Sequence, residues 1–266
     1  MDWKSLLSLL ILSAFPARAQ GIHTDGKPAE TWRLVETFKY RPSAHGSPER
    51  TFIFESRDPS KGEDLPATRL RIQTSGQPEF VVANEFSPWI KLKDDEGSWF
   101  TGRRNLLPSE YVFGLQTPVG GTPHLFLCLV GWAFGSSPGS LHVVDLEGAK
   151  APVVVLRKEE LEFNGMRDLD NDGIPEIIGI PCMTQEWGDH LLTYDPVHVF
   201  ALRQPELTAE LSLALSKVYN EKHYYGWVGP ECSEDWAVVL HPPNGGKPII
   251  MRAKEAESLQ RKPTKK

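Results

Sequence analysis

Cysteine is scarce in this sequence, and several common site motifs are missing. The 266 residues include three cysteines, none of them in a CxxC pair, which excludes a zinc ribbon and a thioredoxin-type redox motif. An HExxH zinc motif and a phosphate-binding glycine loop are also missing. With 29 basic and 35 acidic residues the net charge is −6, so no global basic field recruits nucleic acid or an anionic membrane.

Apolar runs long enough to span a membrane are missing as well, and one shorter apolar run stands near the N-terminus. Leu6–Phe15 is apolar, Lys4 precedes it, and Ala17-Arg18-Ala19 fits the small-x-small rule for signal cleavage. The run is too short for a bilayer, which needs roughly 20 residues. We expect a signal peptide over residues 1–19, the alternatives being a membrane anchor or a buried helix. The mature chain is then secreted or periplasmic and has no membrane span.

Turn residues and short apolar runs, in contrast, are abundant. Gly and Pro number 22 each, and β-branched and aromatic runs alternate with them, which is typical of strands and tight turns. After a flexible linker over 20–31 we expect a single, mainly β domain over 32–252. The expected strands are Arg33–Tyr40, Arg50–Glu55, Thr68–Thr74, Glu79–Ala83, Trp89–Lys93, Tyr111–Gln116, Leu125–Ala133, Leu141–Asp145, Val153–Leu156, Glu176–Ile180, His198–Leu202, Val238–His241 and Pro248–Met251.

One segment has helical rather than strand periodicity. Leu207, Leu211, Leu215 and Val218 recur at helical spacing, which predicts one amphipathic helix over Leu207–Tyr219 that packs this stripe on a sheet. The last residues, 253–266, are polar, and we expect a solvated tail whose front forms a short helix.

A short pattern also recurs along the chain. Gly-x-Pro followed by apolar residues begins at Gly76, Gly121 and Gly173, and a looser copy begins at Gly246. A turn glycine and a proline with fixed φ, followed by a strand, are one way to enter each sheet of a repeated unit. Periods of roughly 45–50 residues are typical of propeller blades, so the expected architecture is β-propeller-like.

The strongest chemical signal is the sequence Asp-Leu-Asp-Asn-Asp-Gly-Ile-Pro-Glu over residues 168–176. Alternate carboxylates at Asp168, Asp170 and Asp172 can aim at one point, and Glu176 adds a fourth. Calcium takes six to eight hard oxygens, including a backbone carbonyl, here that of Ile174. We expect one Ca²⁺ site; magnesium or sodium could occupy the same oxygens, and the alternative is an acidic β-turn without a metal.

This loop is not an EF-hand, because position 12, which needs a bidentate Glu, is Gly179. Residues 168–179, Asp-Leu-Asp-Asn-Asp-Gly-Ile-Pro-Glu-Ile-Ile-Gly, resemble the calcium loop of FG-GAP and VCBS repeats, which occur in integrin-α-like β-propellers. The resemblance covers one full loop and the weaker Gly-x-Pro echoes, which lack the Asp triplet. It implies a propeller-like fold in which the metal makes a blade edge rigid and performs no chemistry.

A polar loop follows the acidic sequence and contains the candidate catalytic residues. Glu186, Asp189 and His190 surround Trp187, and paired carboxylates can hydrolyse glycosidic bonds, while an indole can stack on a sugar ring. The alternative is a polar loop in which Trp187 packs on the core.

The cysteines allow one disulfide in an exported chain. Cys182 and Cys232 lie in turn-like surroundings and are the candidate pair, whereas Cys128 lies in an apolar run and is expected to be a buried thiol. Three free thiols are the alternative.

Together these features predict an exported, non-catalytic β protein with one structural calcium ion, which binds a glycan or a protein at the cell envelope or outside the cell. The alternative is an exported polysaccharide hydrolase or lyase.

Overall fold

Sixteen strands and two helices form in the parts of the chain that the computed structural model describes. These parts are residues 31–41, 48–57, 67–85, 87–93, 104–132, 138–147 and 150–260, and all of them belong to one unit over 31–266. The expected signal peptide over 1–19, the linker over 20–31 apart from Thr31, and the end of the tail over 261–266 lie outside the described residues.

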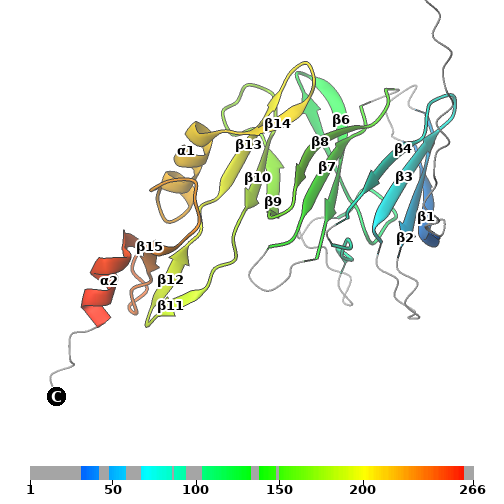
Figure 1. Ribbon diagram of the computed structural model, residues 1–266. Coiled ribbons are helices and arrows are strands. Elements are labelled where there is room, and N and C mark those ends of the chain that lie inside the picture. Colours follow the sequence, from blue (N-terminus) through cyan, green and yellow to red (C-terminus); the bar gives the residue numbers. More distant parts are fainter. Residues whose placement is uncertain are drawn as a thin grey trace, which may run out of the picture. The chain divides into compact units, whose positions relative to one another are not determined.

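The strands form four antiparallel sheets of four strands each, so the fold is mainly β, as expected (Figure 1). The first two sheets are meanders, in which each strand pairs with the next one along the chain. The first contains β1 (Arg33–Tyr40), β2 (Arg50–Ser56), β3 (Arg69–Thr74) and β4 (Phe80–Ala83). The second contains β5 (Phe113–Val119), β6 (Thr122–Val130), β7 (Leu141–Asp145) and β8 (Val153–Lys158).

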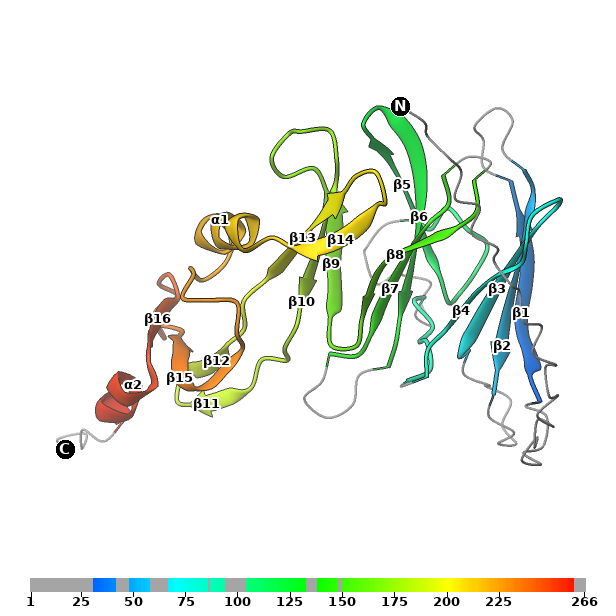
Figure 2. The ribbon, with the colours of Figure 1, turned by 45° about the horizontal axis from the view of Figure 1, so that its top comes forward.

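The third and fourth sheets are interleaved in the sequence. The third has the order β14-β13-β10-β9 and the fourth β11-β12-β15-β16. The chain therefore leaves the third sheet after β10, returns to it at β13, and leaves again after β14 (Figure 2). The elements are β9 (Glu162–Arg167), β10 (Glu176–Ile180), β11 (Glu186–Gly188), β12 (Leu191–Tyr194), β13 (His198–Arg203), β14 (Thr208–Leu211), α1 (Leu213–His223), β15 (Ser233–Leu240), β16 (Ile249–Arg252) and α2 (Ala253–Gln260).

Strand β6 shows why the core forms where it does. It reads as an almost continuous apolar run because both of its faces are covered. Leu127 and Leu129 pack in a cluster with Phe54 of the first sheet. Phe126 and Cys128 alternate with them and pack in a second cluster with residues of the third sheet, including Ile177 and Phe200. The second sheet is thus buried between its two neighbours.

The expected strand Trp89–Lys93 is wrong. The N–H groups of Trp89, Ile90 and Leu92 donate to three separate segments, at Ala67, Val130 and Glu110. The segment is extended, but because its hydrogen bonds are distributed in this way it makes only isolated bridges and no ladder.

The helix expected over Leu207–Tyr219 is partly wrong. Its first residues form β14, which pairs with β13, and the helix begins after Ser212, whose side chain accepts a hydrogen bond from the N–H of Leu215. Of the expected apolar stripe, Leu207 packs against the core from the turn before β14, whereas Val218 on the helix is 58% exposed. The buried residues of α1 are instead Ser216 and Asn220.

The front of the expected tail does form a helix, α2, but the helix is part of the fold. Ala253 and Ala256 are buried in a cluster with Val238 of β15. Neither helix of the described part is long and apolar enough to cross a membrane.

The Gly-x-Pro echoes lie in hairpin turns. Gly76, Gly121 and Gly173 have positive φ and lie between β3 and β4, β5 and β6, and β9 and β10; Gly246 lies between β15 and β16. These turns occupy different places in their sheets, so the echoes do not mark the entry to each sheet. Four four-stranded sheets are established, whereas a closed propeller is not.

Candidate functional site

The acidic loop connects β9 to β10 and is folded by its own carboxylates. Asp168 accepts hydrogen bonds from the N–H groups of Asn171, at 2.7 Å, and Gly173, at 2.9 Å. Asp170 accepts one from Asp172 at 3.2 Å. Asn171 and Gly173 take left-handed backbone conformations, with φ of 65° and 83°, which Asn and Gly tolerate best. The turn residues therefore curl the loop around its acids.

Three of the expected ligands converge. Asp168, Asp170 and Glu176 each offer one oxygen, and these oxygens lie within 4.8 Å of one another. The two aspartates are exposed, whereas Glu176 is 2% exposed. Burial raises the pKa of Glu176 to about 7, and the nearby aspartates add to this effect, against a hydrogen bond from the N–H of Leu169 that lowers the pKa. An acid in these surroundings is unfavourable in its charged form unless a cation is present.

The other two expected ligands have different surroundings. Asp172 is outside the convergent group, and its Oδ1 accepts a 2.7 Å hydrogen bond from the N–H of Ile174. The side chain of Ile174 packs against the core that the second and third sheets share. The N–H of Gly120, in the β5–β6 turn, donates to the carbonyl of Gly173 at 3.0 Å. The loop is therefore attached to both sheets.

The donor set fits a calcium ion. Asp168, Asp170 and Glu176 would hold the ion with carboxylate oxygens, which is the ligand type that calcium prefers. The ion would supply positive charge beside the buried Glu176 and would connect this residue to the exposed Asp168 and Asp170.

The candidate catalytic residues lie on the β11–β12 hairpin. Glu186, Asp189 and His190 are all exposed, and His190 is in the turn, with φ of 62°. Trp187 is partly buried and packs against the cluster around Leu191. The indole thus contributes to the core, as the alternative interpretation held, and the three polar side chains remain on the surface.

The cysteines are arranged as the sequence suggested. Cys182 and Cys232 form a disulfide with Cα atoms 6.2 Å apart. Cys182 follows β10 and Cys232 precedes β15, so the bridge joins two of the connections that run between the third and fourth sheets. Cys128 is a buried free thiol, and burial raises its pKa to about 12.

A buried polar cluster in the second sheet was not predicted. His124 and Asp145 are 4% and 3% exposed, and His124 Nδ1 lies 2.9 Å from Asp145 Oδ1. An oxygen of Glu147 lies within 4.8 Å of ligand atoms of both, but its carboxylate accepts a 2.7 Å hydrogen bond from Lys150. Both carboxylates of this cluster therefore already have partners within the protein. The sequence holds no signal for the cluster, because its strands place residues 21 positions apart side by side.

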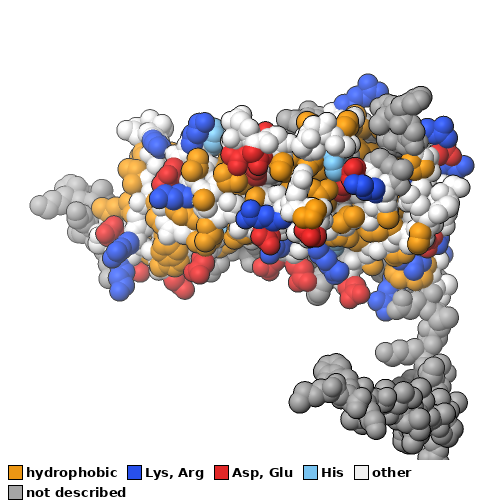
Figure 3. All heavy atoms as spheres, turned by 90° about the horizontal axis from the view of Figure 1, so that it is seen from above, with side chains coloured by type: hydrophobic (Ala, Val, Ile, Leu, Met, Phe, Trp, Pro, Cys, Tyr) orange, Lys and Arg blue, Asp and Glu red, His pale blue; other side chains and the backbone are white. Residues whose placement is uncertain are grey.

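Charge on the surface is mixed. On the face in Figure 3, acidic and basic side chains of the described residues are interspersed, in agreement with a chain whose acidic residues exceed its basic residues only slightly.

Comparison of the chain with protein-family models, curated proteins and solved structures finds no match. The likeness to FG-GAP and VCBS repeats rests on the residues of the loop itself.

Proposed function

We propose that this protein is an exported, non-catalytic β protein in which one Ca²⁺ ion organises the loop over 168–176. Its sheets act as propeller-like blades, and its role is to bind a glycan or a protein at the cell envelope or outside the cell. The observation that carries the proposal is the convergence of Glu176 with Asp168 and Asp170.

Burial distinguishes Glu176 from an ordinary acidic residue on a protein surface. Exposed acidic clusters are common on protein surfaces, but a carboxylate that is 2% exposed beside two other acids costs free energy. A divalent cation removes this cost, and the loop already points its oxygens to one place. Because the loop is attached to both the second and third sheets, the ion would stabilise the junction of two blades.

The sheet topology supports the propeller-like part of the proposal. Each of the four sheets is antiparallel and four-stranded, which is the construction of a propeller blade. The first and second sheets share one hydrophobic cluster, and the second and third share another.

Thermal melting with calcium and with a chelator tests the ion. A ligand bound only by the folded state adds about 2.7 kcal/mol when it is present at 100 times its Kd. We expect calcium to raise the Tm of the wild type and of Asp189→Asn, an exposed acid outside the loop, but not of Asp170→Ala. An equal Tm with calcium and chelator in the wild type would refute the calcium assignment. Magnesium and sodium, added separately, identify the preferred ion.

The non-catalytic part is tested on soluble polysaccharides. We expect no release of reducing ends or unsaturated products above buffer. Turnover that disappears in Glu186→Gln or Asp189→Asn would instead establish the hydrolase or lyase alternative.

A further inference from the structure

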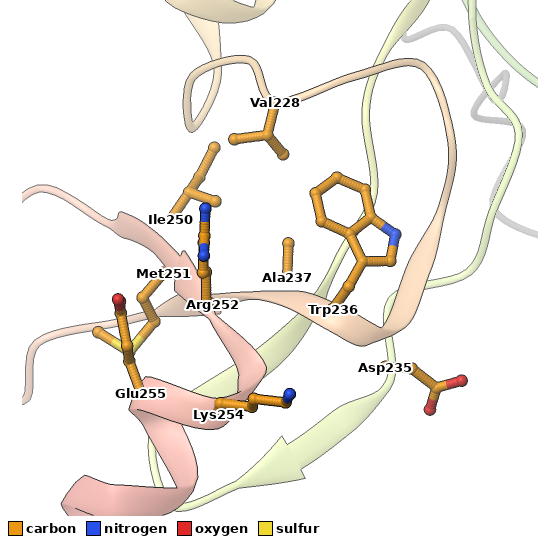
Figure 4. A pocket seen from close by; sticks show the side chains of 9 residues that line it. All are labelled: Val228, Asp235, Trp236, Ala237, Ile250, Met251, Arg252, Lys254 and Glu255. Carbon is orange, nitrogen blue, oxygen red and sulfur yellow. The ribbon is translucent and has the colours of Figure 1, made fainter.

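A pocket of about 720 Å³ opens on the fourth sheet (Figure 4), and none of the candidate residues Glu186, Asp189 and His190 lines it. Strands β15 and β16 and the first turn of α2 supply most of its lining, which includes Trp236, Ala237, Arg252, Lys254 and Glu255. None of these residues stands in a motif that the sequence alone reveals.

A distortion of β15 brings Trp236 into this pocket. Thr193 of β12 pairs with Val238, but the next residue, Tyr194, pairs with Ser233, so the residues between them bulge out of the ladder. The Oγ of Ser233, which is 2% exposed, accepts hydrogen bonds from the N–H groups of Trp236, at 3.1 Å, and Ala237, at 2.8 Å. A buried hydroxyl therefore holds the bulge.

The bulge fixes the indole without burying it. Regular alternation would place Trp236 on the same face as Val238, which packs beneath α2. Instead its ring meets the edge of the buried Tyr194 ring, with centroids 6.2 Å apart. The Trp236 side chain remains 43% exposed. The result is a positioned aromatic surface that faces solvent.

A small residue separates the two sides of the pocket. Ala237 pairs directly with Arg252 across β15 and β16, and in Figure 4 the indole of Trp236 and the guanidinium of Arg252 stand on opposite sides of Ala237. The methyl group of Ala237, which is 2% exposed and packs with Tyr194 and Val239, places no polar group between the indole and the guanidinium.

The charged groups of the pocket are all available to a ligand. Arg252 and Lys254 are exposed donors, and Asp235 and Glu255 are exposed acceptors. Within the described part of the chain, none of the four side chains makes an ion pair or a hydrogen bond. Donors and acceptors thus surround one aromatic face.

We propose that this pocket binds carbohydrate. A sugar ring presents an apolar C–H face that can stack on the Trp236 indole, and hydroxyls that accept hydrogen bonds from Arg252 and Lys254 and donate them to Glu255. The mixture of both charges favours a neutral, polyhydroxylated ligand over an anion or a cation, since either ion would meet a like charge. This inference rests on the proposed binding role and names its ligand class and site.

Native affinity electrophoresis of the full mature chain tests the inference. The gels contain a soluble β-glucan, xylan, galactomannan, dextran or polygalacturonate, each with calcium. We expect at least one neutral polymer to retard the wild type, and Trp236→Ala to weaken binding at least tenfold. Arg252→Gln, a surface change that leaves the sheet intact, should weaken it several-fold.

Trp132→Ala is the matched control, because Trp132 is 55% exposed and lies outside the pocket. It should bind like the wild type, and equal Tm values show that each variant is folded. The inference is overturned if no polymer retards the wild type, if only polygalacturonate does, or if Trp236→Ala and Arg252→Gln both bind normally. None of these results changes the calcium-dependent Tm, so failure of the pocket and failure of the calcium proposal are distinguishable.

Discussion

The carboxylate of Glu176 accepts a 2.7 Å hydrogen bond from the backbone N–H of Leu169. Glu176 begins β10, and Leu169 is the second residue of the acidic loop, so this bond closes the loop at its buried base. The same carboxylate converges with Asp168 and Asp170. One side chain thus connects the candidate ion site to a core strand.

Replacement of Glu176 by Gln should therefore abolish most of the calcium-induced rise in Tm. The amide keeps the size and an oxygen acceptor for Leu169 but removes the negative charge that calcium requires. Calcium titrations followed by Tm measure the effect. Glu159→Gln is the control, since Glu159 is an exposed acid outside the loop. A full calcium response in Glu176→Gln would argue against this carboxylate as a ligand.

The buried polar residues of α1, Ser216 and Asn220, form a polar anchor for the helix. Substitution of a polar residue in this helix should therefore cost more stability than substitution of an apolar one. Asn220 is fully buried; its side chain accepts a hydrogen bond from the N–H of Val197 and donates to the carbonyls of Val197 and Ser216. Asn220→Ala removes the partner of both backbone groups of Val197 and should cost about 3 kcal/mol. Val218→Ala should change stability by less than about 0.5 kcal/mol, because Val218 is exposed.

Urea unfolding of the two variants measures this difference. A larger loss for Val218→Ala than for Asn220→Ala would restore the apolar stripe that the sequence suggested and contradict the polar anchor.

The disulfide predicts a redox-sensitive stability. Cys182 and Cys232 are separated by 50 residues, and cross-linking a loop of this length stabilises a fold by about 2–4 kcal/mol through the unfolded chain. The Cys182→Ser/Cys232→Ser variant should lose this amount, and reductant should lower the Tm of the wild type but not of the variant.

Cys128→Ala is the control for the third thiol. Because the Cys128 thiol is fully buried, it should resist alkylation until the protein unfolds.

The buried side chain of His142 predicts that the folded state loses stability at acidic pH. It is 1% exposed, no described residue hydrogen-bonds its ring, and its ring meets the edge of Trp89. Burial, with a smaller effect from Arg157, lowers the pKa of His142 from 6.5 to about 4. As the pH falls, the imidazole of His142 takes up a proton in the unfolded chain before it does so in the folded chain. The contribution of neutral His142 to the free energy of unfolding is therefore complete above pH 6.5 and is lost between about pH 6.5 and 4, by about 3 kcal/mol.

The free energy of unfolding from pH 7 to pH 4 measures this loss. His142→Leu, which cannot titrate, should lose about 3 kcal/mol less than the wild type over that range. His223→Gln, a change at an exposed histidine, should follow the wild type. Equal losses in the wild type and His142→Leu would remove His142 as the cause.

Local patterns were informative wherever neighbours in sequence decide the structure. The strands Arg33–Tyr40, Leu141–Asp145 and Glu176–Ile180 have the bounds that alternation and turn residues predicted. The acidic loop was also readable, because Asn171 and Gly173 set its turns and the carboxylates bond to amides a few residues away. The loop's own hydrogen bonds join residues two to seven positions apart.

Features that depend on distant partners were not readable. Leu207 and Leu211 have helical spacing, yet pairing with β13 places the residues up to Leu211 in a strand. From the sequence, Trp236 is one more apolar residue of a strand. Its indole lies in the pocket only because β15 bulges between the residues that pair with Thr193 and Tyr194 of β12.

The sequence by itself determined the mainly β composition, the acidic loop and most strand positions, because alternation, turn residues and short-range hydrogen bonds are local. Tertiary structure alone decided the interleaving of the third and fourth sheets, the polar anchoring of α1 and the exposure of Trp236. In each of these cases a backbone group or side chain obtains its partner from a strand far away in the chain, and no local pattern records which strand that is.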